Sequence, residues 1–205
     1  MNKNKTLIAI LGLGMSSGCI SKATDPMQAI LAKRHSGYAY DSSRPVSHEQ
    51  IQQMVKAAQS APSCYNDQPW FFIVCDRATQ PDAYNKVLNA LVEFNQQWAQ
   101  SAPVLIVVAA GMNSREGGHN HWAQYDSGAA AVCMMLQATS LGLMAHQMAG
   151  FDPAKISASF ELPADVMPMA VMAVGYEASE TKVKARERKP QEQNFFAGSW
   201  GNGIR

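Results

Sequence analysis

The sequence has few charged residues and few cysteines. Of its 205 residues, 16% are charged, and the formal net charge is only +1. This balance argues against a protein that binds nucleic acid through electrostatic attraction, and no nucleic-acid partner is expected. The four cysteines form no CxxC pair and have no histidines at zinc-ligand spacing, so neither a disulfide scaffold nor a structural metal site is indicated.

Common catalytic motifs are also missing. From residue 26 onward there is no GxSxG, HExxH or P-loop motif and no glycine-rich dinucleotide fingerprint after a strand. His119 and His121 lie two residues apart, a pattern more typical of surface positions than of a metal site. An enzyme with this sequence is therefore expected to take its chemistry from an organic cofactor.

Residues 1–25 are predicted to be a leader, and residues 26–205 a single domain. Two early lysines, an apolar stretch at 6–15 and the sequence Ser-Ser-Gly-Cys form the pattern of an export signal. The apolar stretch is too short to span a bilayer. The end of this pattern resembles a bacterial lipoprotein signal, which would place the protein in the cell envelope with a lipid on Cys19. Alternatively, Met27 opens a cytoplasmic protein.

Beyond the leader, helical and strand patterns alternate. Helices are expected at 47–60, 81–100 and 121–141 and from Asp152, strands at 70–74, 104–110, 143–148 and 169–176, and a loop at 113–119. The middle of the helix at 121–141 is apolar on nearly every side, which predicts burial all round. Alternation of this kind, taken alone, favours a parallel βαβ sheet.

Three segments have the composition of a site for an anionic, planar ligand. Arg34-His35-Ser36 and Arg186-Glu187-Arg188-Lys189 supply cations suited to phosphate oxygens. Between them, the loop at 62–69 is dense in short hydrogen-bonding side chains. The polar tail also carries Phe195, Phe196 and Trp200, which suggests that it packs on this domain or on a second subunit.

Arg34-His35-Ser36 followed by residues 61–72 (APSCYNDQPWFF) resembles the FMN-dependent nitroreductase superfamily, whose members carry Arg-(Arg/His)-Ser and a Pro-Ser-Ser-x-Asn-x-Gln-Pro-Trp loop. The resemblance extends over residues 27–201, with further matches at 95–98, 126–129, 141–143, 148–152, 174–176 and 186–190. It implies an α+β domain with a mixed sheet flanked by helices, in place of a parallel sheet. It also implies a homodimer with two FMN sites at the interface and a C-terminal arm on the partner subunit.

The implied function is an FMN-dependent oxidoreductase that uses NAD(P)H to reduce nitroaromatic, quinone or similar electron-poor acceptors by a ping-pong mechanism. The alternative is an envelope-anchored flavin-binding protein without NAD(P)H turnover, because NAD(P)H is not expected outside the cytoplasm. No catalytic side chain is expected, since the flavin itself carries the electrons.

The resemblance also implies roles for individual residues. Arg34, His35 and Ser36 would contact the phosphate and ribityl chain, and Arg186 and Arg188 would neutralise the phosphate. Pro62, Ser63, Cys64 and Asn66 would reach the flavin from the other subunit. Asn95 would bond the pyrimidine side, and Gln147, Met148, Ala149 and Gly150 would run past N5.

Four positions depart from the family pattern. Tyr38 stands where many members carry Arg or Lys at the flavin, and Trp98 stands where some carry a second Lys. Less positive charge near the pyrimidine edge makes FMN harder to reduce. Cys64 replaces a common Ser, and Ala149 stands where some members have Glu and others Gly. Neither change conflicts with FMN binding, since Ala149 keeps its backbone N–H.

Overall fold

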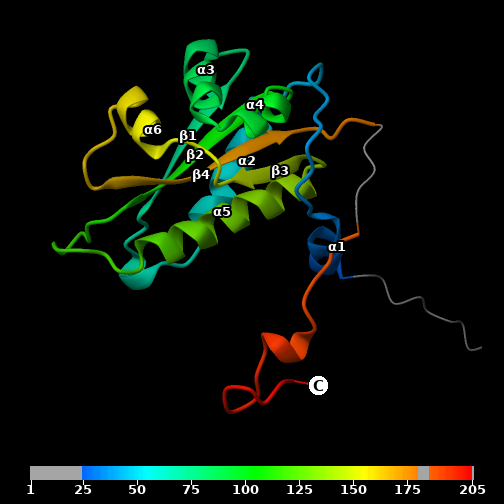
Figure 1. The fold of residues 1–205 in the computed structure, drawn as a ribbon, viewed down its shortest axis with the longest axis vertical. Helices are drawn as coiled ribbons and strands as arrows, with labels where there is room; N and C mark the ends of the chain where they lie inside the picture. The colour runs from blue at the N-terminus through cyan, green and yellow to red at the C-terminus, as the bar shows by residue number, and fades with distance from the viewer. Residues whose placement is uncertain (1–24, 180–184, 205) are drawn as a thin grey trace, which may run out of the picture.

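The computed structural model describes residues 25–179 and 185–204 (Figure 1). The predicted leader, including Cys19, lies outside the described residues. The helices are α1 (Pro26–Lys33), α2 (His48–Gln59), α3 (Pro81–Ala90), α4 (Glu93–Ala99), α5 (Ala123–Ser140) and α6 (Pro153–Ser159), with short 3-10 helices η1 (Cys64–Asn66) and η2 (Gln191–Gln193). The strands are β1 (Trp70–Asp76), β2 (Val104–Gly111), β3 (Met144–Met148) and β4 (Val166–Gly175). Within the described ranges no helix is both long and apolar enough to cross a membrane.

The four strands form one sheet in the order β1-β2-β4-β3, and each neighbouring pair is antiparallel. The α+β class is therefore confirmed. The parallel sheet expected from alternation alone is wrong, and among the described residues the sheet is antiparallel throughout where the resemblance implied a mixed one. β2 and β3, joined through α5, do run in the same direction. They are not neighbours in the sheet. β4, which comes after the short helix α6, lies between them and pairs with both.

Strand β2 is buried along its whole length because helices cover both faces of the sheet (Figure 1). Val104, Ile106 and Val108 face the core that contains residues of α2 and α5. Leu105 and Val107 face the opposite core, beside residues of α3 and α6. A central strand with two covered faces reads as an unbroken apolar run, as the sequence at 104–110 does.

The first predicted helix begins where its capping sequence indicates. The Ser47 hydroxyl accepts a hydrogen bond from the Gln50 N–H at 3.1 Å, and the Gln50 side chain accepts one from the Ser47 N–H at 3.0 Å. The prediction of one helix at 81–100 is wrong, because the chain breaks between α3 and α4. At this break the Val92 N–H donates to the Gly150 carbonyl at 3.0 Å, which brings α4 against the end of β3.

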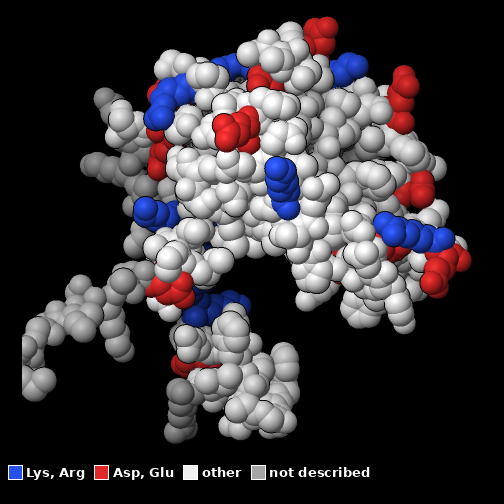
Figure 2. Space-filling model, turned by 180° about the vertical axis from the view of Figure 1, so that it is seen from behind, with Lys and Arg blue, Asp and Glu red and all other residues white. Residues whose placement is uncertain are grey.

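Helix α5 is buried on one side only, so the prediction of burial all round is wrong for this chain. Its inner side chains, such as Met134, are fully buried, whereas Tyr125 is 76% and Val132 49% exposed. The C-terminal tail also leaves large apolar side chains open, with Trp200 91% exposed. Figures 1 and 2 show the end of the tail as a separate lobe extending away from the body of the domain.

Candidate functional site

Three arginines from two distant parts of the sequence meet at the end of α1. Arg186 lies 152 residues after Arg34, and its guanidinium donates to the carbonyls of Leu31 at 3.0 Å and of Arg34. Burial lowers the pKa of Arg34, and repulsion from Arg186 and Arg188 lowers it further. A phosphate placed here would relieve this repulsion, so the cluster is suited to binding an anion.

The neighbours of Arg34 have partners within the chain. His35 Nε2 lies 2.9 Å from a carboxylate oxygen of Glu177, and its Nδ1 lies 2.9 Å from the Lys33 carbonyl. The Ser36 hydroxyl accepts a weak hydrogen bond from Arg34 at 3.4 Å. The structure therefore joins the Arg-His-Ser segment to the residues that follow β4, and it turns His35 toward Glu177.

Four aromatic rings pack together next to the Arg-His-Ser segment, and one of them, His146, belongs to β3. Tyr38 lies edge-on to Trp98 at 5.1 Å and to His146 at 5.0 Å between ring centroids, and Trp98 stacks on His146 at 4.7 Å. Phe94 lies edge-on to Tyr38 at 6.1 Å. Tyr38 and Phe94 remain more than half exposed, so this aromatic cluster offers an apolar surface to a ligand.

His146 makes the stability of this region depend on pH. Burial is the main reason that the pKa of His146 lies below its ordinary value of 6.5, and the Arg34 charge lowers it further, while a 2.8 Å hydrogen bond to the Gly37 carbonyl raises it. The unfolded chain therefore takes up a proton at a higher pH than the folded protein does. The resulting stability is complete above about pH 6.5 and is lost as the pH falls through the lower, folded pKa.

We therefore expect His146→Gln, which does not titrate, to flatten the fall in melting temperature between pH 7 and pH 5, as measured by circular dichroism. His48→Gln, at an exposed position at the start of α2, is the matched control. Equal acid sensitivity in the His146 variant and the wild type would contradict the assignment.

The end of β3 lies against α4 through Asn95. The Asn95 side chain donates to the Gly150 carbonyl at 3.0 Å and accepts from the Trp98 indole at 3.3 Å. A Cβ at Gly150 would lie 2.7 Å from the Asn95 amide nitrogen, so glycine permits this close approach. Toward the part of the chain that the structure describes, Asn95 keeps one N–H and one lone pair unused. Among the same residues, the Ala149 N–H has no acceptor.

The loop that contains Pro62, Ser63, Cys64 and Asn66 lies at the other end of α5. The Cys64 N–H donates at 2.9 Å to the buried carboxylate of Asp126, in the first turn of α5. His35, next to Arg34, lines a pocket together with Thr139, which lies in the last turn of α5. Asp126 and Thr139 are 13 positions apart along α5, which corresponds to roughly 20 Å at 1.5 Å per residue. One chain therefore does not bring this loop to the arginine cluster.

Comparison with known proteins decides the family. The sequence profile of the Nitroreductase family matches residues 31–176, which include the Arg-His-Ser segment, the 62–69 loop and the end of β3. The chain belongs to the nitroreductase family. The resemblance found in the sequence is thereby confirmed.

Two curated proteins and one solved structure illustrate what this nitroreductase chain is similar to. The CLA biosynthesis enone reductase of Lactiplantibacillus plantarum is 25% identical over 168 residues, covering 80% of this chain and 76% of the relative. The oxygen-insensitive NADPH nitroreductase of Helicobacter pylori is 33% identical over 95 residues, 46% of this chain and 43% of the relative. A crystal structure described as an oxidoreductase containing FMN has a TM-score of 0.78 at 26% identity, and the match covers 92% of this chain and 100% of that chain.

Sequence reasoning did not assign roles to His146 or Asp126 of this nitroreductase. His146 alternates with Met144 and Met148 along β3, so period-2 alternation places it on the same face as two side chains of the core. Asp126 is a carboxylate within an apolar helix, and only 4% of it is exposed. A charge in such a place needs a partner, which was a signal available in the sequence.

Proposed function

We propose that this nitroreductase is a homodimeric, FMN-dependent oxidoreductase that uses NAD(P)H to reduce electron-poor acceptors by a ping-pong mechanism. The observation that carries the proposal is the meeting of Arg34 with Arg186 and Arg188, because two separate motifs of the sequence form one cationic cluster. The FMN-containing structural relative and the NADPH nitroreductase relative support the cofactor and the enzyme class.

The residues present fit the parts of FMN. Arg34, Arg186 and Arg188 would hold the phosphate, and the rings of Tyr38 and Trp98 would provide apolar packing for the isoalloxazine. The Ala149 N–H, which has no acceptor within residues 25–179 and 185–204, is suited to donate to a ring nitrogen. The chemistry that bound FMN would supply to these residues is acceptance of a hydride from NAD(P)H and transfer of electrons to the acceptor.

Exposed apolar surface supports the homodimer. The outer face of α5, which includes Tyr125 and Val132, is open in one chain, and so are Phe195 and Trp200 of the tail. A second copy of the chain would cover both surfaces. It would also supply the loop of Ser63 and Cys64, which lies too far from the arginine cluster within one subunit. The C-terminal tail would then lie on the partner.

The names of the relatives indicate the acceptor class. One relative is an enone reductase and another a nitroreductase. Enones, nitroaromatics and quinones share a conjugated system that ends in oxygen. We propose acceptors of this class for the present protein.

The test is an absorbance spectrum of the purified protein before and after anaerobic addition of NADPH or NADH. Flavin bands that bleach support the proposal. Bound flavin that neither nucleotide reduces favours a flavin-binding protein without NAD(P)H turnover. No flavin band, even after FMN is added, contradicts the assignment of the cofactor.

A further inference from the structure

The imidazole of His146 lies where the aromatic cluster meets the end of β3. It stacks on Trp98 at 4.7 Å and lies edge-on to Tyr38 at 5.0 Å between ring centroids. These are the two rings that would pack on the isoalloxazine. Along the chain His146 comes three residues before Ala149, whose N–H is suited to a ring nitrogen of the flavin. His146 therefore belongs to the group of residues that would surround the flavin ring.

The hydrogen bonds of His146 show which of its nitrogens can accept a proton. Nδ1 lies 2.8 Å from the Gly37 carbonyl, which can only accept a hydrogen bond, so Nδ1 carries a proton. Toward residues 25–179 and 185–204, Nε2 has no hydrogen-bond partner. In the neutral ring Nε2 therefore keeps a free lone pair, and this is where a second proton would bind.

The groups around His146 favour its neutral form as long as no negative charge is near. Arg34 and Tyr38 face it from the segment after α1, Trp98 faces it from α4, and Ala173 pairs with it in β4, while α5 packs on the other face of the sheet. Burial is the main cause that holds the pKa of His146 below 6.5, and the charge of Arg34 lowers it further. A new negative charge beside the ring would act in the opposite direction.

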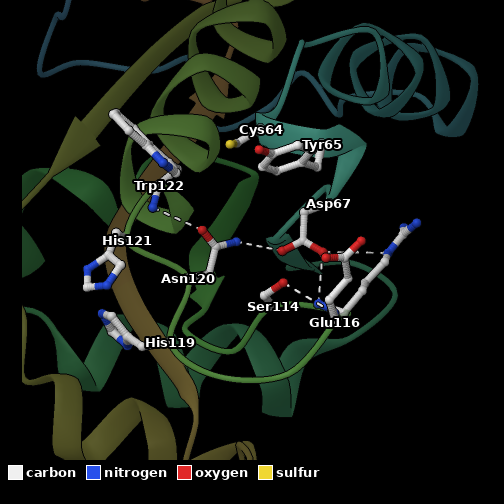
Figure 3. Close-up of a pocket in the computed structure, with 10 residues that line it drawn as sticks. Cys64, Tyr65, Asp67, Ser114, Glu116, His119, Asn120, His121 and Trp122 are labelled. Carbon is white, nitrogen blue, oxygen red and sulfur yellow. Dashed lines mark hydrogen bonds and ion pairs between the residues drawn. The ribbon is translucent and has the colours of Figure 1, made fainter.

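The other four of the five histidines do not share this position. His35 has both ring nitrogens 2.9 Å from oxygens of the chain that can only accept, so neither nitrogen is free. His48 is exposed at the start of α2. His119 and His121 lie edge-on to each other at 4.8 Å in a separate pocket (Figure 3), which no residue of β3, α4 or the segment after α1 lines. His146 is therefore the histidine that a charge on the flavin ring would affect most.

We propose that His146 takes up a proton from water when bound FMN is reduced and releases it when the flavin is oxidised again. The inference rests on the proposed function, in which a hydride brings two electrons and one proton to the flavin. The reduced ring system then carries one negative charge, and the second proton, on Nε2, makes His146 the positive counter-charge. When two electrons pass to the acceptor, the flavin and His146 each release one proton to the acceptor or to water.

The surroundings make this counter-charge effective. The rings of Tyr38, Phe94 and Trp98 are uncharged and displace water from one side of His146, so they screen its charge less than water does. Acceptors of the proposed class, such as quinones, take up two protons with two electrons. A site that stores one proton on the flavin and one on His146 holds the number that this reduction consumes.

The experiment is an anaerobic titration of the FMN-loaded full chain against redox dyes at pH values from about 5 to 8. Each proton taken up with two electrons makes the potential fall by about 30 mV per pH unit. Where His146 adds its proton, the potential is expected to fall by about 60 mV per pH unit in the wild type and by about 30 mV in His146→Gln. His48→Gln is expected to match the wild type. Equal slopes in His146→Gln and the wild type would overturn the proposal, because the second proton would then bind elsewhere.

His146→Asn separates proton uptake from the contact with Gly37. The asparagine amide can donate to the Gly37 carbonyl as Nδ1 does but cannot take up a proton, so the shallow slope is expected in this variant as well. A wild-type slope in His146→Asn would overturn the proposal.

Histidine NMR measures the proton on His146 directly, and the signal that His146→Gln lacks identifies the residue. Its titration is expected to move to higher pH when dithionite reduces the bound flavin. The same titration in the oxidised and the reduced protein would overturn the proposal. Flavin that dithionite reduces and NAD(P)H does not would contradict the proposed function, while both measurements would still test His146.

Discussion

Replacing Arg34 or Arg188 with glutamine is expected to weaken FMN binding by roughly tenfold to a hundredfold, because each charge-assisted contact to a phosphate contributes about 1.5 to 3 kcal/mol. These two arginines are better test positions than Arg186, whose guanidinium also holds the carbonyls at the end of α1. Loss of either side chain also relieves repulsion within the cluster, so the free protein is not expected to be destabilised.

The measurement is titration of flavin-free protein with FMN and with riboflavin, followed by quenching of flavin fluorescence. Riboflavin keeps the ribityl chain but lacks the phosphate, so the variants are expected to lose much less affinity for riboflavin than for FMN. Lys56→Gln, which removes a positive charge from the exposed side of α2, is the matched control. Equal losses of affinity for FMN and riboflavin would show that the arginines act on the fold and not on the phosphate.

Local signals in the sequence predicted most of the elements. Ser47 and Gln50 form the expected capping box, and the apolar run at 104–110 is the fully buried β2. The break between α3 and α4 was not predictable from periodicity, because the Val92 N–H finds its acceptor at Gly150, far along the chain. The strand directions also depend on contacts between distant segments. β4 pairs with both β2 and β3, and the alternation of helices and strands along the sequence does not determine which strands pair.

Some residues of the candidate site could be predicted from the sequence, and others could not. The arginines were predictable because phosphate needs cations, and their residue types alone indicate an anion site. The contact of His146 with Tyr38 and Trp98 could not be predicted, because it brings together three segments that are distant in the sequence. The burial of α5 could not be predicted for another reason. An apolar helix face has the same composition whether it packs inside the chain or stays exposed, as Tyr125 and Val132 are here.

Tyr38→Arg is expected to raise the reduction potential of bound FMN by about 20 to 60 mV for the two-electron couple. A positive charge roughly 6 to 16 Å from the charge that develops on the reduced flavin contributes about 1 to 3 kcal/mol at an effective dielectric constant near 20, and 1.4 kcal/mol corresponds to about 30 mV. Tyr38 is 54% exposed, so an arginine fits there without being buried. In the present chain this place is occupied by the neutral rings of Tyr38, Phe94 and Trp98.

An anaerobic titration against a redox dye of known potential measures this shift, which does not depend on any acceptor. Phe71→Arg adds the same charge at a half-exposed aromatic position on β1, the strand at the opposite edge of the sheet from β3, and is expected to leave the potential unchanged. A potential that stays the same or falls in Tyr38→Arg would contradict the placement of residue 38 beside the flavin. A rise confined to Tyr38→Arg would mean that the aromatic cluster of Tyr38, Phe94, Trp98 and His146 keeps FMN harder to reduce than basic residues would. The protein would then transfer electrons at a lower potential, which favours the reduction of acceptors that are themselves difficult to reduce.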